Sequence, residues 1–185
     1  MHLVLASASP RRKALLEAAG VTCTVIPADV DETPEPGETP SAHVRRLARA
    51  KALEVARSEP HAVILGADTV VVIDGDILGK PAAAAEARDM LRRLSGRVHQ
   101  VYTGVALWCD GDIRDAVDVT EVEMCALSDQ QIDRYVASGE PAGKAGAYAI
   151  QGLASRFVSR INGSYSNVVG LPVALVCGWL DEVCA

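Results

Sequence analysis

Short apolar runs separated by longer amphipathic stretches dominate the first third of the chain. An amphipathic stretch repeats its apolar residues every three or four positions and predicts a helix, whereas a short apolar run predicts a buried strand. By these criteria the chain begins with a strand, a helix, a second strand, a loop rich in Pro and acidic residues, and a second helix. Their expected ranges are 3–6, 9–19, 22–26, 27–40 and 41–57.

The pattern then changes to longer strands joined by tight turns. Residues 63–73 form a strongly apolar run, and Asp74-Gly75 predicts a hairpin turn into a short strand. Two further long strands meet around Asp110-Gly111, and helices alternate with them. The expected ranges are strands at 98–109 and 114–126, helices at 82–94, 128–137 and from 171 onward, and a Gly-rich region at 139–170. Helices mixed with hairpins predict an α/β protein whose sheet is not purely parallel.

Length and composition fit one globular domain over residues 1–185, or two small lobes that share a core. The net charge of -6 argues against a long nucleic acid as partner, because such binding depends on Lys and Arg. No apolar run is long enough to span a membrane, and the first residues lack the features of a signal peptide. The five cysteines are odd in number and form no C-x-x-C pair, so we expect a protein of the reducing cytoplasm.

The first candidate for binding chemistry is the segment Ser9-Pro10-Arg11-Arg12-Lys13. Ser9 and Pro10 suit the start of a helix, where free N–H groups and the helix dipole favour an anion. Three cations in a first turn oppose that dipole, and a bound phosphate would compensate for them. The alternative is a solvated helix start with ordinary surface charges.

Asp68 and Lys51 are charged residues in apolar surroundings. Asp68 lies inside the apolar run at 63–73, where an ionised carboxylate is costly unless it is paired or bound to a metal. The preceding Gly66-Ala67 would allow another group to approach the backbone closely. Lys51 lies seven residues after Val44, on the apolar face of the second helix. Asp68 could instead cap a strand bend, and Lys51 could extend along the helix surface to solvent.

Other segments are weaker candidates for a phosphate or metal site, or do not match the motif that they resemble. Gly79-Lys80-Pro81 is not a P-loop, because its spacing is one residue short and Pro follows the Lys, yet Lys80 can still bind phosphate. The pair Asp31-Glu32 could hold Mg²⁺ through carboxylate oxygens or could be a solvated acidic loop. The four histidines lack the spacing of a zinc site or of a His-based triad.

Taken in order, these segments resemble the Maf family along essentially the whole chain. No single one of them is decisive, but a chance match of the whole series is very improbable. The matching segments are Ala6-Ser7-Ala8-Ser9-Pro10-Arg11-Arg12, Val30-Asp31-Glu32, Leu47-Ala48-Arg49-Ala50-Lys51-Ala52, Gly66-Ala67-Asp68-Thr69-Val70, Gly79-Lys80-Pro81, Ser95-Gly96-Arg97-Val98-His99, Lys144-Ala145-Gly146-Ala147-Tyr148-Ala149-Ile150-Gln151-Gly152 and Gly163-Ser164-Tyr165-Ser166-Asn167-Val168-Val169-Gly170-Leu171-Pro172.

The resemblance implies an elongated mixed sheet flanked by helices, with two lobes and a central cleft, similar to inosine triphosphatases. It implies a cytoplasmic nucleoside triphosphate pyrophosphatase that uses Mg²⁺ or Mn²⁺, and that can form homodimers. Asp68 matches the catalytic base, and Arg11, Thr69 and Gln151 match positions tied to substrate choice. The remaining cleft residues that match are Ser9, Arg12, Glu32, Lys51 and Lys80.

The segment around Gln151 resembles the family branch that acts on dTTP and UTP, including modified pyrimidine nucleotides. We expect Asp68 to activate a water that attacks the α-phosphorus, Glu32 and Asp68 to hold the metal, and the cations with Ser9 to bind phosphates. Two alternatives stay open. One is a pyrophosphatase for 7-methyl-GTP, whose branch carries Ser-Phe in place of Ala147-Tyr148. The other is a nucleotide-binding regulator of cell division, which is not an enzyme.

Overall fold

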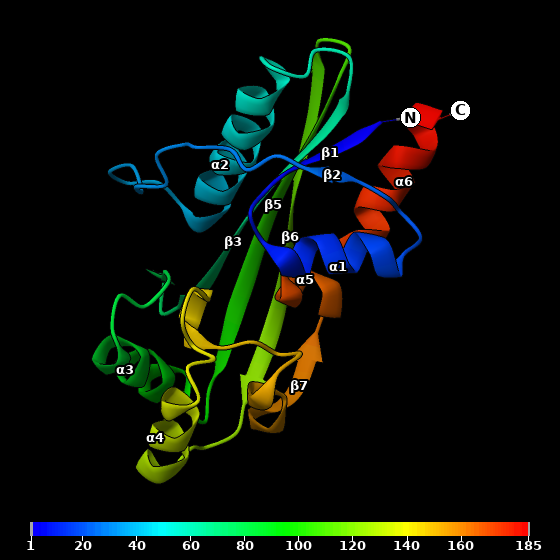
Figure 1. Ribbon diagram of the computed structural model, residues 1–185. Helices are drawn as coiled ribbons and strands as arrows, with labels where there is room; N and C mark the ends of the chain where they lie inside the picture. Colours follow the sequence, from blue (N-terminus) through cyan, green and yellow to red (C-terminus); the bar gives the residue numbers. More distant parts are fainter. Residues whose placement is uncertain (1, 185) are drawn as a thin grey trace. The chain divides into compact units, whose positions relative to one another are not determined.

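The structure is a computed structural model that describes residues 2–184, without the side chain of residue 184 (Figure 1). Seven strands form one mixed sheet in the order β2-β1-β3-β5-β6-β7, with β4 paired to β3. Helices and two short 3-10 turns occupy the connections. The elements are β1 (Leu3–Ala6), α1 (Pro10–Ala18), β2 (Thr24–Val25), α2 (Pro40–Ala56), β3 (Val63–Ile73), β4 (Asp76–Leu78), α3 (Ala84–Leu94), β5 (Val98–Cys109), β6 (Asp112–Met124), α4 (Asp129–Ala137), η1 (Ala145–Ala147), η2 (Leu153–Phe157), β7 (Val158–Asn162), α5 (Tyr165–Val169) and α6 (Val173–Cys184).

The chain divides into two compact units, and β3, β5 and β6 contribute residues to both. The first unit contains the chain up to Thr69, Thr103–Asp118 and the C-terminal segment from Gly170. In it β1 lies between β2 and β3 and is parallel to both. Strands β1 and β3 are almost fully buried, which explains their continuous apolar runs in the sequence, whereas both residues of the edge strand β2 are exposed.

Alternate residues of β1 and β3 build two separate cores in the first unit. Leu3, Leu5 and Leu65 pack with α1 and α6. Val4, Ala6 and Ile64 point the other way and pack with Ala48, Ala52 and Val55 of α2. Because side chains alternate along a strand, Gly66 and Asp68 continue the row that faces α2, and Ala67 and Thr69 continue the row on the α1 side.

The second unit contains Val70–Tyr102 and Val119–Val169. Here β3 turns into β4 through Asp74 and Gly75, both with positive φ, and the two strands are antiparallel. Strand β7 pairs with β6, also antiparallel. Helices α3 and α4 lie side by side (Figure 1). Tyr135 of α4 packs edge-on against Phe157, with ring centroids 5.5 Å apart.

The predicted class, a mixed α/β sheet flanked by helices, is confirmed. So are both hairpins, and the capping box that joins Ser128 and Gln131 at the start of α4. Several helix boundaries differ from the predicted ones. Helix α2 begins after Thr39, whose hydroxyl accepts from Ala42 N–H, and α3 begins at Ala84. The prediction missed β7 and α5, because the Gly-rich sequence around them carries little hydrophobic periodicity.

Among the described residues, no helix is both long enough and apolar enough to cross a bilayer. Cys23, Cys109, Cys125 and Cys177 are free thiols.

Candidate active site

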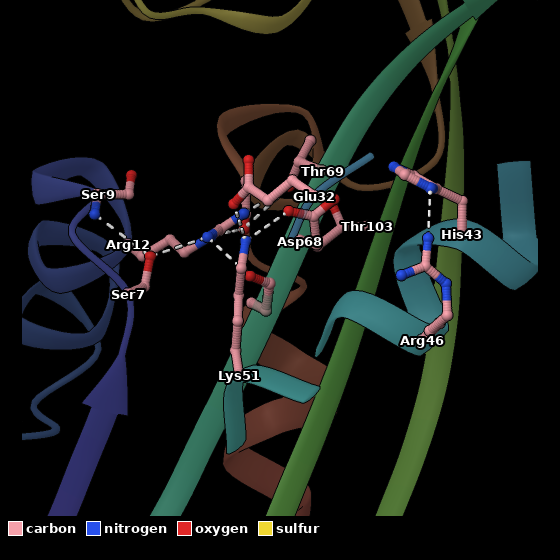
Figure 2. Close-up of polar contacts among 12 residues, drawn as sticks. Ser7, Ser9, Arg12, Glu32, His43, Arg46, Lys51, Asp68, Thr69 and Thr103 are labelled. Atoms are coloured by element: carbon pink, nitrogen blue, oxygen red, sulfur yellow. Dashed lines mark hydrogen bonds and ion pairs between the residues drawn. The ribbon is translucent and has the colours of Figure 1, made fainter. Parts of the chain in front are cut away.

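Lys51 joins the two carboxylates that the sequence singled out. Its Nζ donates to Asp68 Oδ1 at 2.8 Å and to Glu32 Oε1 at 2.5 Å (Figure 2). Asp68 comes from the middle of β3, Lys51 from α2 and Glu32 from the loop before α2. The Lys51 and Asp68 side chains are only 9% and 11% exposed, so Lys51 does not extend to solvent, and Asp68 is paired as a buried carboxylate must be.

Glycine lets α2 come close enough to β3 for this pairing. A Cβ at Gly66 would overlap the carbonyl oxygen of Ala48 and lie 2.8 Å from the backbone nitrogen of Ala52, both in α2. Gly104 of β5 meets the backbone of Val44 in the same way. The prediction that Gly66 permits a close approach is therefore confirmed, and the helix backbone that carries Lys51 lies directly against the strand that carries Asp68.

Arg12 reaches the other side of the same strand. Its Nη1 donates to Ala67 O and its Nη2 to Thr69 Oγ1, at 2.9 and 3.0 Å, so the guanidinium contacts the residues before and after Asp68 (Figure 2). Nε donates to Gly170 O at 2.7 Å, and Nη1 also to Ser7 Oγ at 2.9 Å. Four of the five guanidinium N–H groups are thus directed at protein acceptors in the described part of the chain.

The Arg12 side chain is buried, and this affects its pKa. Burial lowers the pKa of Arg12, and the negative charges of Asp68 and Glu32 counteract that effect. The charge of the adjacent Arg11 adds to the lowering. Arg11 itself is half-buried, and burial lowers its pKa as well. The charges of Asp68, Glu32 and Arg11 therefore all act on the Arg12 guanidinium.

Thr69 is held through its hydroxyl. Besides accepting from Arg12, Thr69 Oγ1 lies 2.9 Å from Thr103 Oγ1 and donates to Gly170 O at 3.4 Å. Ser9 is the residue before α1, as predicted, but its side chain makes no capping hydrogen bond, and its backbone N–H donates to Ser7 Oγ at 3.2 Å. The Ser9 hydroxyl therefore does not satisfy the first N–H groups of α1, which suits the predicted role of this turn in anion binding.

A second ion-pair cluster fixes the loop that carries Glu32. Arg46 Nε and Nη2 donate to both oxygens of Glu38, at 2.7 and 2.8 Å, and Nη2 also donates to the carbonyl of Thr33 at 3.1 Å. His43 Nδ1 lies 3.0 Å from the Glu38 carboxylate and 3.4 Å from Arg46 Nη2, the contact that Figure 2 shows. The hydrogen bonds from Arg46 lower the pKa of Glu38 to about 2. Sequence reasoning missed this cluster, although His43 and Arg46 are three residues apart on one helix, a spacing that brings side chains together.

Lys80 and Gln151 belong to the second unit. Lys80 is exposed just after β4, and Gln151 is exposed just before η2. The backbone after Gln151 is held by Glu140, whose carboxylate accepts from Leu153 N–H at 2.9 Å and from Ala154 N–H at 3.3 Å. Tyr135 in turn donates its hydroxyl to Glu140 at 2.8 Å. Sequence reasoning also missed this support, because nothing in the spacing relates Glu140 to the segment after Gln151.

The first unit offers oxygen ligands for a divalent cation. No three His, Cys, Asp or Glu side chains of residues 2–184 converge as a ready-made metal centre. Glu32 and Asp68 nevertheless converge on one ammonium, and Mg²⁺ is commonly held by one or two carboxylates together with water and substrate phosphates. Their hard oxygen donors fit Mg²⁺ or Mn²⁺ when a phosphate ligand completes the coordination.

With a mixed α/β fold and a buried acid surrounded by cations, the site is typical of an enzyme that handles phosphates. The family model described as "Maf-like protein" matches residues 2–183, and the chain belongs to this family. A protein of Geotalea uraniireducens named "dTTP/UTP pyrophosphatase" is 53% identical over 178 residues, which are 95% of this chain and 91% of that protein. One of the same name from Pelotomaculum thermopropionicum is 49% identical over 183 residues, covering 98% and 96%. Among solved structures, the Staphylococcus aureus Ham1 protein aligns with a TM-score of 0.47 and 15% identity, over 67% of this chain and 72% of its own.

Proposed function

We propose that this chain is a nucleoside triphosphate pyrophosphatase that hydrolyses dTTP and UTP to the monophosphate and pyrophosphate. Modified pyrimidine nucleotides are further candidate substrates. One observation carries the proposal: a buried acid, Asp68, shares the Lys51 ammonium with Glu32 in a region where Arg12 and Arg11 add positive charge. The names of the relatives, which are about 50% identical over nearly their whole length, support the same activity.

Asp68 is the general base in this proposal. It takes a proton from a water that attacks the α-phosphorus, and pyrophosphate leaves. Positioning and charge stabilisation account for most of the catalysis of such reactions. Ser9, Lys51 and Lys80 bind the phosphates. Arg12 adds its charge and the one N–H group that its described contacts leave for a ligand.

Glu32 and Asp68 are the residues that would hold Mg²⁺ or Mn²⁺. A bound divalent cation would offset the charge of the phosphate oxygens and of the leaving pyrophosphate. The Arg46 contact to Thr33 keeps the adjacent Glu32 on the side of the loop that faces Lys51.

Arg11, Thr69 and Gln151 set the choice of substrate. The Gln151 amide offers both a donor and an acceptor, as the edge of a pyrimidine base requires. Thr69 is fixed by three hydroxyl contacts, so its methyl group and backbone present a constant surface to a ligand. We also propose that residues 1–185 act as one Maf-like domain, in the cytoplasm, and that the chain can form a homodimer.

A substrate panel tests the proposal. The chain is incubated with dTTP, UTP, 7-methyl-GTP and the common purine triphosphates, with Mg²⁺ or Mn²⁺ and with EDTA, and pyrophosphate and monophosphate are quantified. We expect turnover of dTTP and UTP that EDTA abolishes. Preferred turnover of 7-methyl-GTP would favour the sister activity, and nucleotide binding without turnover would favour the regulator of cell division.

Asp68→Asn tests the general base. Asn keeps the shape of the side chain and can still accept from Lys51, so the fold should persist. Removing a general base typically costs about 10²–10⁴ in rate. We expect kcat for dTTP to fall by that factor while the melting temperature stays within a few degrees. A variant that keeps the kcat of the unaltered chain would contradict the role of Asp68.

A further inference from the structure

Lys51 occupies the space between the two carboxylates proposed to hold the metal. Its ammonium has three N–H groups, and two of them are directed at Asp68 and Glu32. The helix that carries Lys51 is held on the sheet by packing, because Ala48, Ala52 and Val55 are buried in one core with β1 and β3. The Lys51 ammonium is therefore the cation that these carboxylates hold in the structure.

The fixed charges at this position balance without a metal. Asp68 and Glu32 contribute two negative charges, and Lys51 and Arg12 contribute two positive charges, with Arg11 close by. A dication arriving alone would meet a positive ammonium in a poorly solvated place and no net negative charge to attract it. A dication arriving with a triphosphate brings its own compensating charge.

We propose that Lys51 excludes the metal ion from this site when no nucleotide is bound and admits it only together with a phosphate ligand. This inference rests on the proposed function, in which Glu32 and Asp68 bind the metal. When the triphosphate is present, the Lys51 ammonium leaves the carboxylates and donates to phosphate oxygens instead. Its four-carbon stem is flexible enough to change partners while the helix backbone stays in place. Lys51 thereby makes metal binding conditional on substrate.

Mn²⁺ binding to the full chain without nucleotide tests this exchange by titration calorimetry. Lys51→Met removes the ammonium and keeps an unbranched side chain of similar length. We expect Lys51→Met to bind Mn²⁺ on the order of tenfold more tightly than the unaltered chain, while its dTTP turnover falls. A positioning or phosphate-binding role alone would lower turnover and leave Mn²⁺ affinity unchanged.

Arg57→Met is the matched control, because it removes one positive charge from the same helix, α2, outside the proposed site. Arg57 caps the C-terminal end of α2 and pairs with Glu54 at 2.6 Å on an exposed surface. Its Mn²⁺ affinity should equal that of the unaltered chain. Adding Glu32→Gln to Lys51→Met should remove the gain in affinity. Equal Mn²⁺ affinity in Lys51→Met and Arg57→Met would overturn the proposal.

A measurement on the unaltered chain covers the case in which Lys51→Met does not fold. Ammonium resonances of ¹⁵N-lysine report on whether the buried Lys51 keeps its carboxylate partners. We expect the protected resonance to persist when Mg²⁺ is added alone and to shift when Mg²⁺ and pyrophosphate are added together. A shift with Mg²⁺ alone would overturn the proposal. These readouts involve no turnover, so they are distinct from the test of the pyrophosphatase activity, which fails only if dTTP and UTP are not cleaved.

Discussion

Arg12 donates to the hydroxyl of Thr69 at 3.0 Å and thereby links the first turn of α1 to the residue that follows Asp68. The same guanidinium also holds the carbonyl of Ala67, the residue before Asp68. An arginine that was expected to bind phosphate is thus also a clamp on the strand that presents the proposed base. Lys51 of α2 holds the Asp68 carboxylate itself, so α1 fixes the strand on both sides of Asp68 and α2 fixes its side chain.

Arg12→Lys tests whether the site needs only the positive charge of Arg12 or also its planar set of hydrogen-bond donors. Lysine keeps the positive charge but cannot reproduce the planar fork that serves four acceptors. Buried acceptors left without a donor cost about 1–3 kcal/mol. We expect the free energy of unfolding, measured in urea, to fall by this amount, and kcat for dTTP to fall by about 10²-fold through misplacement of Asp68. Arg11→Lys is the control and should keep the stability of the unaltered chain, because Arg11 is only half-buried.

Gly66→Ala tests the close approach of α2 and β3. The added methyl group would overlap the carbonyl of Ala48 and must push the helix away from the strand. Overpacking of this kind costs about 1–3 kcal/mol, and here it also separates Lys51 from Asp68. Gly178→Ala in α6 is the matched control, since nothing lies within 4 Å of its added Cβ. We expect it to stabilise the helix by ~1 kcal/mol. Equal melting temperatures for the two variants would contradict the packing argument.

Glu38 should make stability depend on pH in the acid range. The pKa of Glu38 is lowered from 4.5 to about 2 by its hydrogen bonds to Arg46, so the folded state favours the ionised form. Its contribution to stability is complete above pH 4.5 and is lost as the pH falls towards 2. We expect the stability difference between the unaltered chain and Glu38→Gln, measured in urea, to shrink over that range. A constant difference would show that the Glu38 charge is not what Arg46 requires.

Tyr135→Phe tests whether Glu140 supports the proposed base-reading residue Gln151. The change removes the hydroxyl that donates to Glu140 at 2.8 Å and accepts from Ala149 N–H at 3.3 Å. We expect KM for dTTP to rise severalfold with kcat nearly unchanged, because Asp68 and Lys51 are untouched. In a Gln151→Ala background the same change should have little further effect on KM. Additive effects on KM in this double-mutant cycle would mean that Tyr135 acts independently of Gln151.

Local sequence was sufficient for the elements whose signals lie within a few residues. The turn at Asp74-Gly75 and the capping box at Ser128 were predicted because turn and cap preferences are properties of adjacent residues. The need of Asp68 for a partner was also foreseeable, because a buried carboxylate must be paired or bound to a metal. For Lys51 the sequence left two possibilities open, extension to solvent or contact with an anionic group.

The sequence by itself determined the α/β class, most strands and helices, and the need for Asp68 to be paired or bound to a metal. Only the tertiary structure decided that Lys51 is the partner of Asp68, that Arg12 contacts both neighbours of Asp68, and that Glu38, His43 and Arg46 anchor the Glu32 loop. The physical reason is distance along the chain. Hydrophobic periodicity and turn chemistry act over a few residues, whereas Arg12 meets Gly170 only after the whole chain has folded around the sheet.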